Sequence, residues 1–403
     1  MNDSQLARRR FIQFLAASPL FAGLGPGRLL ANVTSEALLA PVSSAADALD
    51  VFDFERVAER VLPPAHFGYL ATGTDGDETL RANRAAFDKL YLRAMRMVDT
   101  SAIDTSLELL GEKLSSPIVI APAGSQRAFH PDGELATARA ARSRDHLQIL
   151  SNVTTTPIEE VIEARGAPVW FQLYPSSNFS VGEKMVKRAE KAGAPVVVLT
   201  VDINSDSKRV ALSRYIRLDE RDCSACHDPA REDSWLDRKP MYQDTGATSA
   251  EFPTPGMTWD YIARLKDICS MKVVIKGVVT AEDAESALKN GADALIVSNH
   301  GGRAEASGWG SLDSLPEVLG AVDGEIPVMI DSGFRRGTDI FKALALGADA
   351  VCIGRAYLWG LAAFGQPGVE KVLDILRAEL ALVMGQMGTP SLKDIGPGSI
   401  GRH

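Results

Sequence analysis

The chain has 403 residues, of which 45% are hydrophobic and 24% charged. This composition is that of a globular protein with a large core, and the length suggests two or three domains unless the chain forms one large α/β barrel. The net charge of −9 at pH 7 disfavours nucleic acid or an anionic membrane surface as a partner. The body of the chain contains no stretch that is long and apolar enough for a membrane-spanning helix.

The first 31 residues resemble an export signal. Three arginines at 8–10 precede Phe11 and a moderately apolar run that Pro and Gly interrupt. This pattern is typical of a twin-arginine signal peptide, and an amphipathic N-terminal helix is the alternative. Twin-arginine export carries folded proteins, often with a bound cofactor, into the bacterial periplasm, where disulfides and haem c can form. Residues 32–50 are rich in Ala and Ser, and we expect them to form a loose linker.

The body of the chain alternates between helical and strand-like patterns. A helical pattern runs from Phe52 to about Asp88 with an interruption at 72–79. Eight short apolar runs follow, at 117–122, 147–151, 169–174, 196–202, 272–277, 294–299, 327–332 and 350–354. They are β-branched or continuously apolar, as expected of parallel strands buried on both faces, and helical stretches separate them. Eight β–α units in series predict an α/β fold of the TIM (β/α)8 barrel type.

The connection after the fourth predicted strand is enlarged. The step from Val201 to Lys276 covers 75 residues, whereas most steps from one strand end to the next cover about 22 to 33. The surplus forms an insertion at 204–255 that contains the sequence CSACH. This insertion opens on the face of the barrel where active sites lie. Long loops in compact domains are usually functional or disordered.

Polar residues gather at the predicted carboxyl ends of the strands, where the active site of a TIM barrel is built. They are Ser151, Gln172, Tyr174, Thr200, Asp202, Lys276, Ser298, His300, Arg303, Asp331, Arg335, Gly354 and Arg355. Any one of them has an ordinary structural explanation, such as a surface ion pair or a turn glycine. A barrel mouth that combines a His, an Asp, a Lys and three Arg nevertheless predicts a catalytic site.

The residue types suggest separate roles. His300, in SNHGGR, is the candidate base, because histidine is the residue type best suited to proton transfer at neutral pH. Asp202 could hold its imidazole and stabilise the protonated form. Arg303 and Arg209 offer guanidinium forks that suit a carboxylate. Lys276 is either a Schiff-base nucleophile or a cation that stabilises an anionic ring. Glycines and arginines in DSGFRRG and GRA follow strands seven and eight, at the usual phosphate pocket of such barrels.

Seven separated motifs carry a resemblance to a known family. They are FGYLATGTDGDETLRANRAAF, IAPAGSQRAFHPDGE, FQLY, LTVD, VIKGV, SNHGGR and IDSGFRRGTDIFKALALGADAVCIGR. Together they make residues 51–396 similar to the FMN-dependent α-hydroxy-acid dehydrogenases and oxidases, which include glycolate oxidase, lactate oxidase, mandelate dehydrogenase and the flavocytochrome lactate dehydrogenases. The resemblance implies FMN as cofactor, oxidation of an L-2-hydroxy acid to the 2-oxo acid, and a homo-oligomer, commonly a tetramer.

The resemblance also implies a role for each site residue. His300, paired with Asp202, removes a proton from the substrate, and Tyr174 contacts the substrate hydroxyl. The substrate carboxylate lies against Tyr69, Arg303 and Arg209. Lys276 lies near flavin N1 and stabilises the reduced, anionic ring. The further cofactor-binding residues are Ala121, Pro122, Ala123, Gly124, Ser151, Gln172, Thr200 and Ser298 around the ring, and Asp331, Gly333, Arg335, Gly354 and Arg355 at the ribityl chain and phosphate.

The chain departs from the family pattern at positions that bear on specificity. Many relatives have Ala where Gly124 stands, so we expect altered space at the reactive edge of the flavin. Val153 replaces a bulky aromatic residue of some relatives, which affects substrate fit. The sequence AEAS at 304–307 stands where an acidic position is usual.

Three functional classes compete at this point. The first is an FMN oxidoreductase acting on L-2-hydroxy acids, with a dehydrogenase that uses a periplasmic cytochrome or respiratory acceptor favoured over an oxygen-using oxidase. The second is another phosphate-binding barrel, such as an FMN-dependent isomerase or an aldolase using Lys276, which leaves Asp202, His300 and Arg303 together unexplained. The third is a non-catalytic flavin or haem electron-transfer protein, although the acid–base and carboxylate-binding residues are all present.

The sequence CSACH supplies Cys223, Cys226 and His227, the attachment signature of haem c. Haem c would use all three residues, with Met241 as a candidate distal ligand. A CxxC disulfide is plausible in an oxidising compartment but leaves His227 unexplained. A zinc corner lacks a fourth ligand other than nearby Asp and Glu, and chance is the remaining reading. We favour haem c, and we expect no other metal site.

Overall fold

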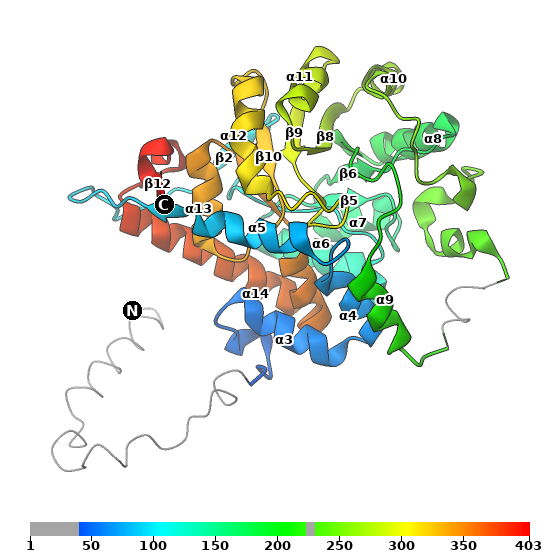
Figure 1. The fold of residues 1–403 in the computed structure, drawn as a ribbon, viewed down its shortest axis with the longest axis horizontal. Coiled ribbons are helices and arrows are strands. Elements are labelled where there is room, and N and C mark those ends of the chain that lie inside the picture. The colour runs from blue at the N-terminus through cyan, green and yellow to red at the C-terminus, as the bar shows by residue number, and fades with distance from the viewer. Residues whose placement is uncertain (1–39, 223–229) are drawn as a thin grey trace, which may run out of the picture. The chain divides into compact units, whose positions relative to one another are not determined.

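The computed structural model describes residues 40–222 and 230–403 (Figure 1). The export signal predicted over residues 1–31 and the CSACH sequence with Cys223, Cys226 and His227 lie outside the described residues. Residues 42–403 form one compact unit. No helix among the described residues is long and apolar enough to cross a membrane.

Eight parallel strands form one sheet in the order β4-β11-β10-β9-β8-β7-β6-β5. A parallel bridge between Ile120 and Gln148 joins the two end strands and closes the sheet into a barrel. The strands are β4 (Ile118–Ile120), β5 (Ile149–Ser151), β6 (Trp170–Leu173), β7 (Val196–Thr200), β8 (Lys272–Val278), β9 (Ala294–Val297), β10 (Val328–Ile330) and β11 (Ala350–Ile353). All eight lie within or overlap the apolar runs that predicted them, so the expected TIM barrel is confirmed.

The strands read as continuously apolar because both of their faces are buried. Side chains alternate along each strand, so one set fills the barrel interior and the other meets the surrounding helices. The interior cluster includes Val119, Ile149, Trp170, Val198, Val274, Ile296, Met329 and Ala350. Leu109 and Leu114 belong to the same cluster and come from the hairpin of β2 (Leu107–Leu109) and β3 (Glu112–Leu114). Trp170 Nε1 donates to Glu112 Oε1 at 2.6 Å, which fixes this hairpin against the first residue of β6.

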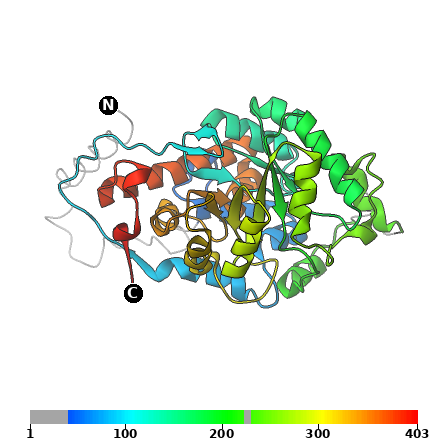
Figure 2. The same ribbon diagram turned by 90° about the horizontal axis from the view of Figure 1, so that it is seen from above.

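Helices surround the barrel, as the view from above shows (Figure 2). They are α3 (Val51–Val61), α4 (Pro64–Ala71), α5 (Glu78–Asp88), α6 (Gly133–Arg144), α7 (Ile158–Arg165), α8 (Phe179–Lys191), α9 (Val210–Arg217), α10 (Asp260–Ile268), α11 (Ala281–Lys289), α12 (Ser311–Val322), α13 (Gly337–Leu346) and α14 (Arg355–Met387). Short 3-10 helices are η2 (Ala45–Asp47), η3 (Gln126–Ala128), η4 (Glu232–Arg238), η5 (Pro240–Tyr242), η6 (Ser249–Glu251), η7 (Leu392–Asp394) and η8 (Pro397–Ser399). The backbone of α14 leaves the helical conformation at Phe364 and Gly365, just before Pro367.

Both predicted domain boundaries need correction. The linker expected over 32–50 is not loose where it is described, because Ala48 is buried in the core and Asp50 caps α3 by accepting from Phe52 N at 2.9 Å. The barrel domain does not end at residue 396. Strand β12 (Ile400–Arg402) pairs antiparallel with β1 (Leu90–Leu92), so the domain extends to Arg402.

The insertion at 204–255 carries structure of its own in its described part, including α9 and η4 to η6. Helix α9 packs on α4, where the rings of Tyr215 and Phe67 lie 6.0 Å apart. Asn152, directly after β5, donates to the Tyr242 hydroxyl at 2.9 Å and ties the insertion to the barrel. Met241 is fully buried in the hydrophobic core, and this position does not favour the role of a distal haem ligand.

Candidate active site

The polar residues predicted at the strand ends line one level of the barrel mouth. Because strand side chains alternate, a residue two positions after an interior residue faces inward again. Trp170 and Val274 belong to the interior cluster, and Gln172 and Lys276 follow them by two positions. The same relation holds for Ala121, Ser151, Thr200, Ser298 and Asp331. The parallel register places Ser151 beside Gln172 and Thr200 beside Lys276, at the carboxyl ends of their strands.

His300 forms hydrogen bonds on both sides of its ring. Its Nδ1 lies 2.8 Å from Oδ1 of Asp202, and its Nε2 lies 3.0 Å from the Tyr174 hydroxyl. Because a carboxylate only accepts, His300 donates from Nδ1 and presents a lone pair at Nε2. Burial raises the pKa of Tyr174 well above its ordinary value, so this hydroxyl stays protonated and donates a hydrogen bond to Nε2. The three side chains therefore leave Nε2 of His300 as a proton acceptor that faces the pocket.

The backbone at His300 adopts a rare conformation, with φ of 58°. This left-handed region costs a residue with a side chain about 1–2 kcal/mol. The Ser298 hydroxyl accepts from His300 N at 3.0 Å and offsets part of that cost. Asp202 reaches the ring only because Gly277 lacks a side chain, since a Cβ there would lie 2.7 Å from the Asp202 Cβ.

Lys276 is held as a cation beside this group. Its Nζ donates to the Ser298 hydroxyl at 2.7 Å and lies 3.0 Å from Oδ2 of Asp331 and 3.9 Å from Oδ2 of Asp202. Burial lowers the pKa of Lys276, but the two carboxylates outweigh burial and hold the pKa above its ordinary value. A Schiff base needs a neutral amine. The geometry therefore argues against Lys276 as a nucleophile and for its role as a fixed positive charge.

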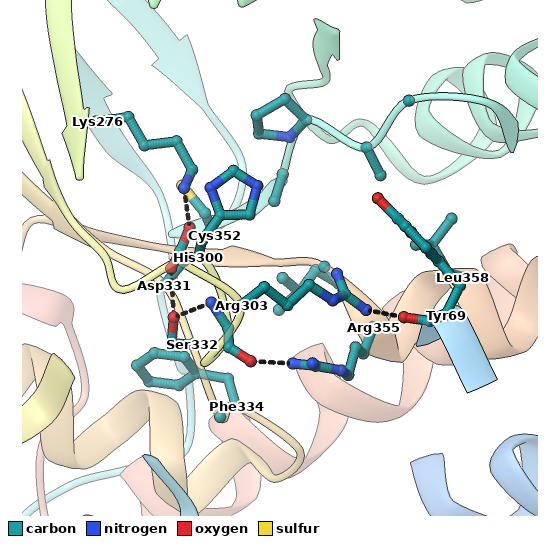
Figure 3. A pocket seen from close by; sticks show the side chains of 18 of the residues that line it. Tyr69, Lys276, His300, Arg303, Asp331, Ser332, Phe334, Cys352, Arg355 and Leu358 are labelled. Carbon is teal, nitrogen blue, oxygen red and sulfur yellow. Dashed lines mark hydrogen bonds and ion pairs between the residues drawn. The ribbon is translucent and has the colours of Figure 1, made fainter. Parts of the chain in front are cut away.

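Four arginines gather around the other side of the pocket. Arg303 donates to the carbonyl oxygen of Tyr69 at 2.8 Å (Figure 3) and to that of Leu70 at 3.0 Å. Arg209 donates to the same Tyr69 oxygen at 3.0 Å. Arg355 donates to backbone carbonyls that include Gly301 O at 2.7 Å. Arg335 donates to Phe334 O at 2.7 Å and stacks on Trp359 at 4.4 Å. None of the four forms an ion pair with a carboxylate of the described residues.

The pKa values reflect this concentration of positive charge. Burial lowers the pKa of Arg355 well below its ordinary value, and Arg303, Arg335 and Arg209 add to that effect. Burial likewise lowers the pKa of Arg335 to about 10, and burial with Arg303 lowers that of Arg209 to about 10. Buried charges in proteins are normally paired. A pocket that places several guanidinium groups together, none of them ion-paired with a carboxylate of the described residues, is therefore suited to anionic ligands.

Buried polar atoms without partners indicate where a cofactor ring fits. Both amide atoms of Gln172 and the hydroxyl of Thr200 are buried and form no hydrogen bond with the described residues. Leaving such atoms unsatisfied is costly. A flat heterocycle with donors and acceptors on its edge would satisfy them, and the arginines would take its phosphate. The donors of the pocket thus fit FMN, which the sequence predicted.

Most of the predicted site residues lie around one pocket, and two groups of residues differ from this arrangement. The pocket is lined by Tyr69, Ala121, Pro122, Ala123, Gly124, Tyr174, Lys276, His300, Arg303, Asp331, Gly333, Arg335, Gly354 and Arg355. Ser151, Gln172, Thr200 and Ser298 lie buried beneath this lining. Arg209 contacts the backbone and ring of Tyr69, at 4.7 Å from the ring centroid, and does not itself line the pocket.

Sequence reasoning missed residues that share the same pocket. Ser332 accepts from Gly301 N at 2.9 Å, and Cys352 faces the barrel interior two positions before Gly354. The alternation of inward and outward positions in AVCIG could have identified Cys352. Phe129 also lines the pocket and stacks near Tyr69, with ring centroids 6.3 Å apart. It comes from an irregular turn, which has no periodic signal.

The altered space expected at Gly124 is taken up by Val153. A Cβ on Gly124 would lie 2.9 Å from the Cβ of Val153, so Val153 already occupies the room that a methyl group would take. The two departures from the family pattern therefore compensate each other. Glycine is needed here because Val153 approaches the turn closely.

Comparison with known proteins supports FMN as the cofactor of this pocket. The chain matches the family of FMN-dependent dehydrogenases over residues 58–402. It is 41% identical to glycolate oxidase 3 of Arabidopsis thaliana over 355 residues, which cover 86% of this chain and 94% of that protein. It is 38% identical to the L-lactate oxidase of Lysinibacillus sphaericus (strain C3-41) over 373 residues, which cover 91% and 94%.

Solved structures are similar as well. A mandelate oxidase in complex with (S)-2-phenylpropionate superposes with a TM-score of 0.76 at 32% identity, covering 88% of this chain and 98% of that one. A lactate oxidase from Pediococcus acidilactici superposes with a TM-score of 0.77 at 32% identity, covering 89% and 95%. With the family match spanning most of the chain and the pocket built for an anionic flavin cofactor, the chain belongs to the FMN-dependent dehydrogenase family.

Proposed function

We propose that this protein oxidises an L-2-hydroxy acid to the 2-oxo acid in the periplasm, with FMN as cofactor and a cytochrome or respiratory carrier as electron acceptor. The observation that carries the reaction is the pairing of one proton acceptor, Nε2 of His300, with a cluster of guanidinium groups that lack carboxylate partners. The similar proteins named above act, by their names, on glycolate, L-lactate and mandelate, which are all 2-hydroxy acids.

His300 acts as the base of the reaction. Its Nε2 takes a proton from the substrate, and the resulting imidazolium is stabilised by Asp202 at 2.8 Å from Nδ1. The Tyr174 hydroxyl, 3.0 Å from Nε2, marks where the substrate hydroxyl lies during this step.

The substrate carboxylate is held by Arg303 together with Tyr69. The Arg303 guanidinium is a planar fork that matches a carboxylate, and its Nε is buried without a hydrogen-bond partner among the described residues. Arg209 supports this arrangement through the Tyr69 backbone and ring. This placement orients the hydroxyl-bearing carbon toward His300.

FMN supplies the group that accepts two electrons from the substrate. The residues that hold it are Ala121 to Gly124, Ser151, Gln172, Thr200 and Ser298 around the ring, and Asp331, Gly333, Arg335, Gly354 and Arg355 at the ribityl chain and phosphate. Lys276 remains protonated in this setting and stabilises negative charge that develops nearby.

The electron acceptor has two candidates. A periplasmic cytochrome is favoured by the export-like N-terminus and by CSACH, which lies in the insertion that opens on the catalytic face. Oxygen is favoured by the names of the similar proteins, which are oxidases. Stoichiometric hydrogen peroxide with no reduction of cytochrome c would select oxygen, and rapid cytochrome c reduction with little peroxide would select the cytochrome.

Haem c on Cys223, Cys226 and His227 is part of the proposal. Substrate electrons would pass from FMN to this haem and on to the acceptor, one at a time. Expression with a cytochrome c maturation system, followed by denaturing electrophoresis and haem staining, tests it. Absence of covalent haem, or equal staining of a variant with Cys223→Ala and Cys226→Ala, would refute the haem hypothesis. A CxxC disulfide would then be the next hypothesis to test.

Anaerobic titration tests the proposed reaction itself. Purified protein should show flavin bands that bleach on addition of an L-2-hydroxy acid from a panel of short, long and aromatic members. Bleaching by none of them would refute the reaction. The export signal is tested separately by fractionating cells that express the full chain and a variant with Arg8→Lys and Arg9→Lys.

A further inference from the structure

A second cavity adjoins the active-site pocket. It has a volume of about 440 Å³ and shares the side chains of Tyr69 and Phe129 with the pocket. The two cavities also meet along the turn after β4, where Gly124 lines the first and Ser125 the second. A water molecule takes up about 30 Å³ of liquid, so this space greatly exceeds what the methyl group of a small hydroxy acid needs.

The walls of the second cavity are largely apolar and come from the insertion and from α4. Leu212 and Ile216 belong to α9, Trp235 belongs to η4, and Ala65 is the second residue of α4. These residues, except Ala65, belong to the insertion after β7, which contributes little to the pocket around His300. The cavity can therefore hold an aliphatic chain that starts at the reacting carbon.

Lys239 gives this cavity a buried positive charge. The residue is 7% exposed, and its Nζ donates to the Ser125 hydroxyl and to Val153 O at 3.1 Å. Neither partner is charged, and Lys239 forms no ion pair with a carboxylate of the described residues. An ammonium group has three donors, so one remains for another acceptor. Burial lowers the pKa of Lys239 to about 8 and outweighs the opposing effect of the Glu134 carboxylate, which forms no ion pair with it.

The charged residues that line the cavity in the described part of the chain share one sign. Arg127 and Arg238 line it together with Lys239, and no Asp or Glu of residues 40–222 or 230–403 does. A purely apolar substrate side chain would leave the buried ammonium of Lys239 without an ion-pair partner among the described residues. A side chain that ends in a carboxylate would compensate it.

We propose that the second cavity holds the side chain of the hydroxy acid and that Lys239 binds a carboxylate at its end, so that the substrate is a 2-hydroxy dicarboxylic acid. This inference rests on the proposed function. Arg303 holds the carboxylate next to the reacting carbon, the apolar walls contact the methylene groups, and Lys239 takes the distal carboxylate. Lys239 is then a residue that determines specificity and takes no part in proton transfer.

Matched substrates test the inference. Anaerobic flavin reduction and steady-state turnover are measured with L-2-hydroxyadipate against L-2-hydroxyhexanoate, and with L-2-hydroxyglutarate against L-2-hydroxypentanoate. Within each pair the chain length is equal and only the terminal group changes. The dicarboxylate of the better pair should have a kcat/KM at least tenfold higher, because a hydrogen bond to a charged group changes binding by about tenfold to a hundredfold.

Variants of Lys239 distinguish a role in binding the substrate from a purely structural role. Lys239→Met should raise KM for the dicarboxylate about tenfold or more with kcat nearly unchanged, and should leave the monocarboxylate unaffected, while Lys239→Arg should retain most of the preference. Lys184→Met is the matched control, because Lys184 likewise forms two hydrogen bonds between the insertion and the rest of the chain, to Asp244 O at 3.3 Å and Thr245 O at 3.1 Å, but does not line the cavity. If Lys239→Met does not fold, Leu212→Glu, which adds a negative charge to the cavity wall, should reverse the preference.

Different results would refute the preference for a dicarboxylate and the oxidation of 2-hydroxy acids. Equal or higher kcat/KM for both monocarboxylates in the wild-type protein would overturn the inference and leave the oxidation of 2-hydroxy acids intact. A Lys239→Met protein that slows both members of a pair alike would show that Lys239 only braces the insertion. Absence of flavin bleaching with every acid would refute the proposed function instead.

Discussion

Replacing Asp202 by Asn should slow flavin reduction about 10- to 1,000-fold while leaving FMN bound. Asp202 lies 2.8 Å from His300 Nδ1, and only 6% of its side chain is exposed, so solvent screens this pair weakly. Losing a charged hydrogen-bond partner that stabilises charge formed during a reaction costs about 1.5–4 kcal/mol, which corresponds to about 10- to 1,000-fold in rate. Asn keeps the size of the side chain but loses the charge that stabilises the imidazolium formed when His300 takes the proton.

Stopped-flow absorbance at the flavin band, under anaerobic conditions and at saturating L-2-hydroxy acid, measures this rate. Asp206→Asn is the matched control, because Asp206 is an exposed carboxylate four positions further along the same connection. Flavin content from the absorbance ratio excludes loss of cofactor as the cause. A rate within twofold of the wild-type value for Asp202→Asn would refute the assignment of His300 and Asp202 as the base and its stabilising partner.

Four other outcomes can be checked independently. Arg303→Lys should raise KM for the hydroxy acid at least tenfold, because a point charge does not replace a bidentate fork, and an unchanged KM would show that the carboxylate binds elsewhere. Thr200→Val should weaken FMN binding to the apoprotein about five- to tenfold in a fluorescence titration. It should not lower the stability of the apoprotein, since the Thr200 hydroxyl has no hydrogen-bond partner among the described residues. An unchanged affinity for FMN would count against the flavin site. Burial lowers the pKa of Lys239 from 10.5 to about 8, so between these pH values the unfolded chain holds a proton that the folded protein has lost. The free energy of unfolding of the wild type relative to Lys239→Met should therefore rise from pH 8 to 10.5 in urea titrations, and a flat difference would mean that the ammonium is solvated. Cys352 is 1% exposed and burial raises its pKa, so mass spectrometry should find it unmodified by iodoacetamide in the native protein at pH 8, in contrast to the unfolded chain.

The barrel and most of its mouth were predictable from sequence because both depend on local periodicity. Parallel strands buried on both faces appear as short apolar runs, and a polar residue at the end of such a run, for example Lys276 or Asp331, has to face the barrel mouth. The place of a polar residue at the end of a predicted strand was therefore enough to assign it to the site. The motifs of the family then assigned roles that the residue types alone left open, such as the choice between a nucleophile and a fixed cation at Lys276.

The parts that sequence reasoning missed depend on long-range contacts. Lys239 lies in an insertion without periodic pattern, and its importance comes from burial against Ser125 and Val153, which are far away in sequence. The compensation between Gly124 and Val153 has the same origin. The domain end was misplaced because β12 gains its strand character from pairing with β1, about 310 positions earlier in the chain.

A single-turnover experiment with product analysis tests the central claim most directly. Under anaerobic conditions, one equivalent of an L-2-hydroxy acid that the protein accepts should bleach the bound FMN and yield one equivalent of the 2-oxo acid, while the D-enantiomer yields none. The His300→Ala protein, with FMN bound, should form the product at a rate lower by a factor of about 10²–10⁴. Equal product from both enantiomers, or a near-normal rate in His300→Ala, would contradict the account of this site as an L-2-hydroxy-acid-oxidising centre with His300 as its base.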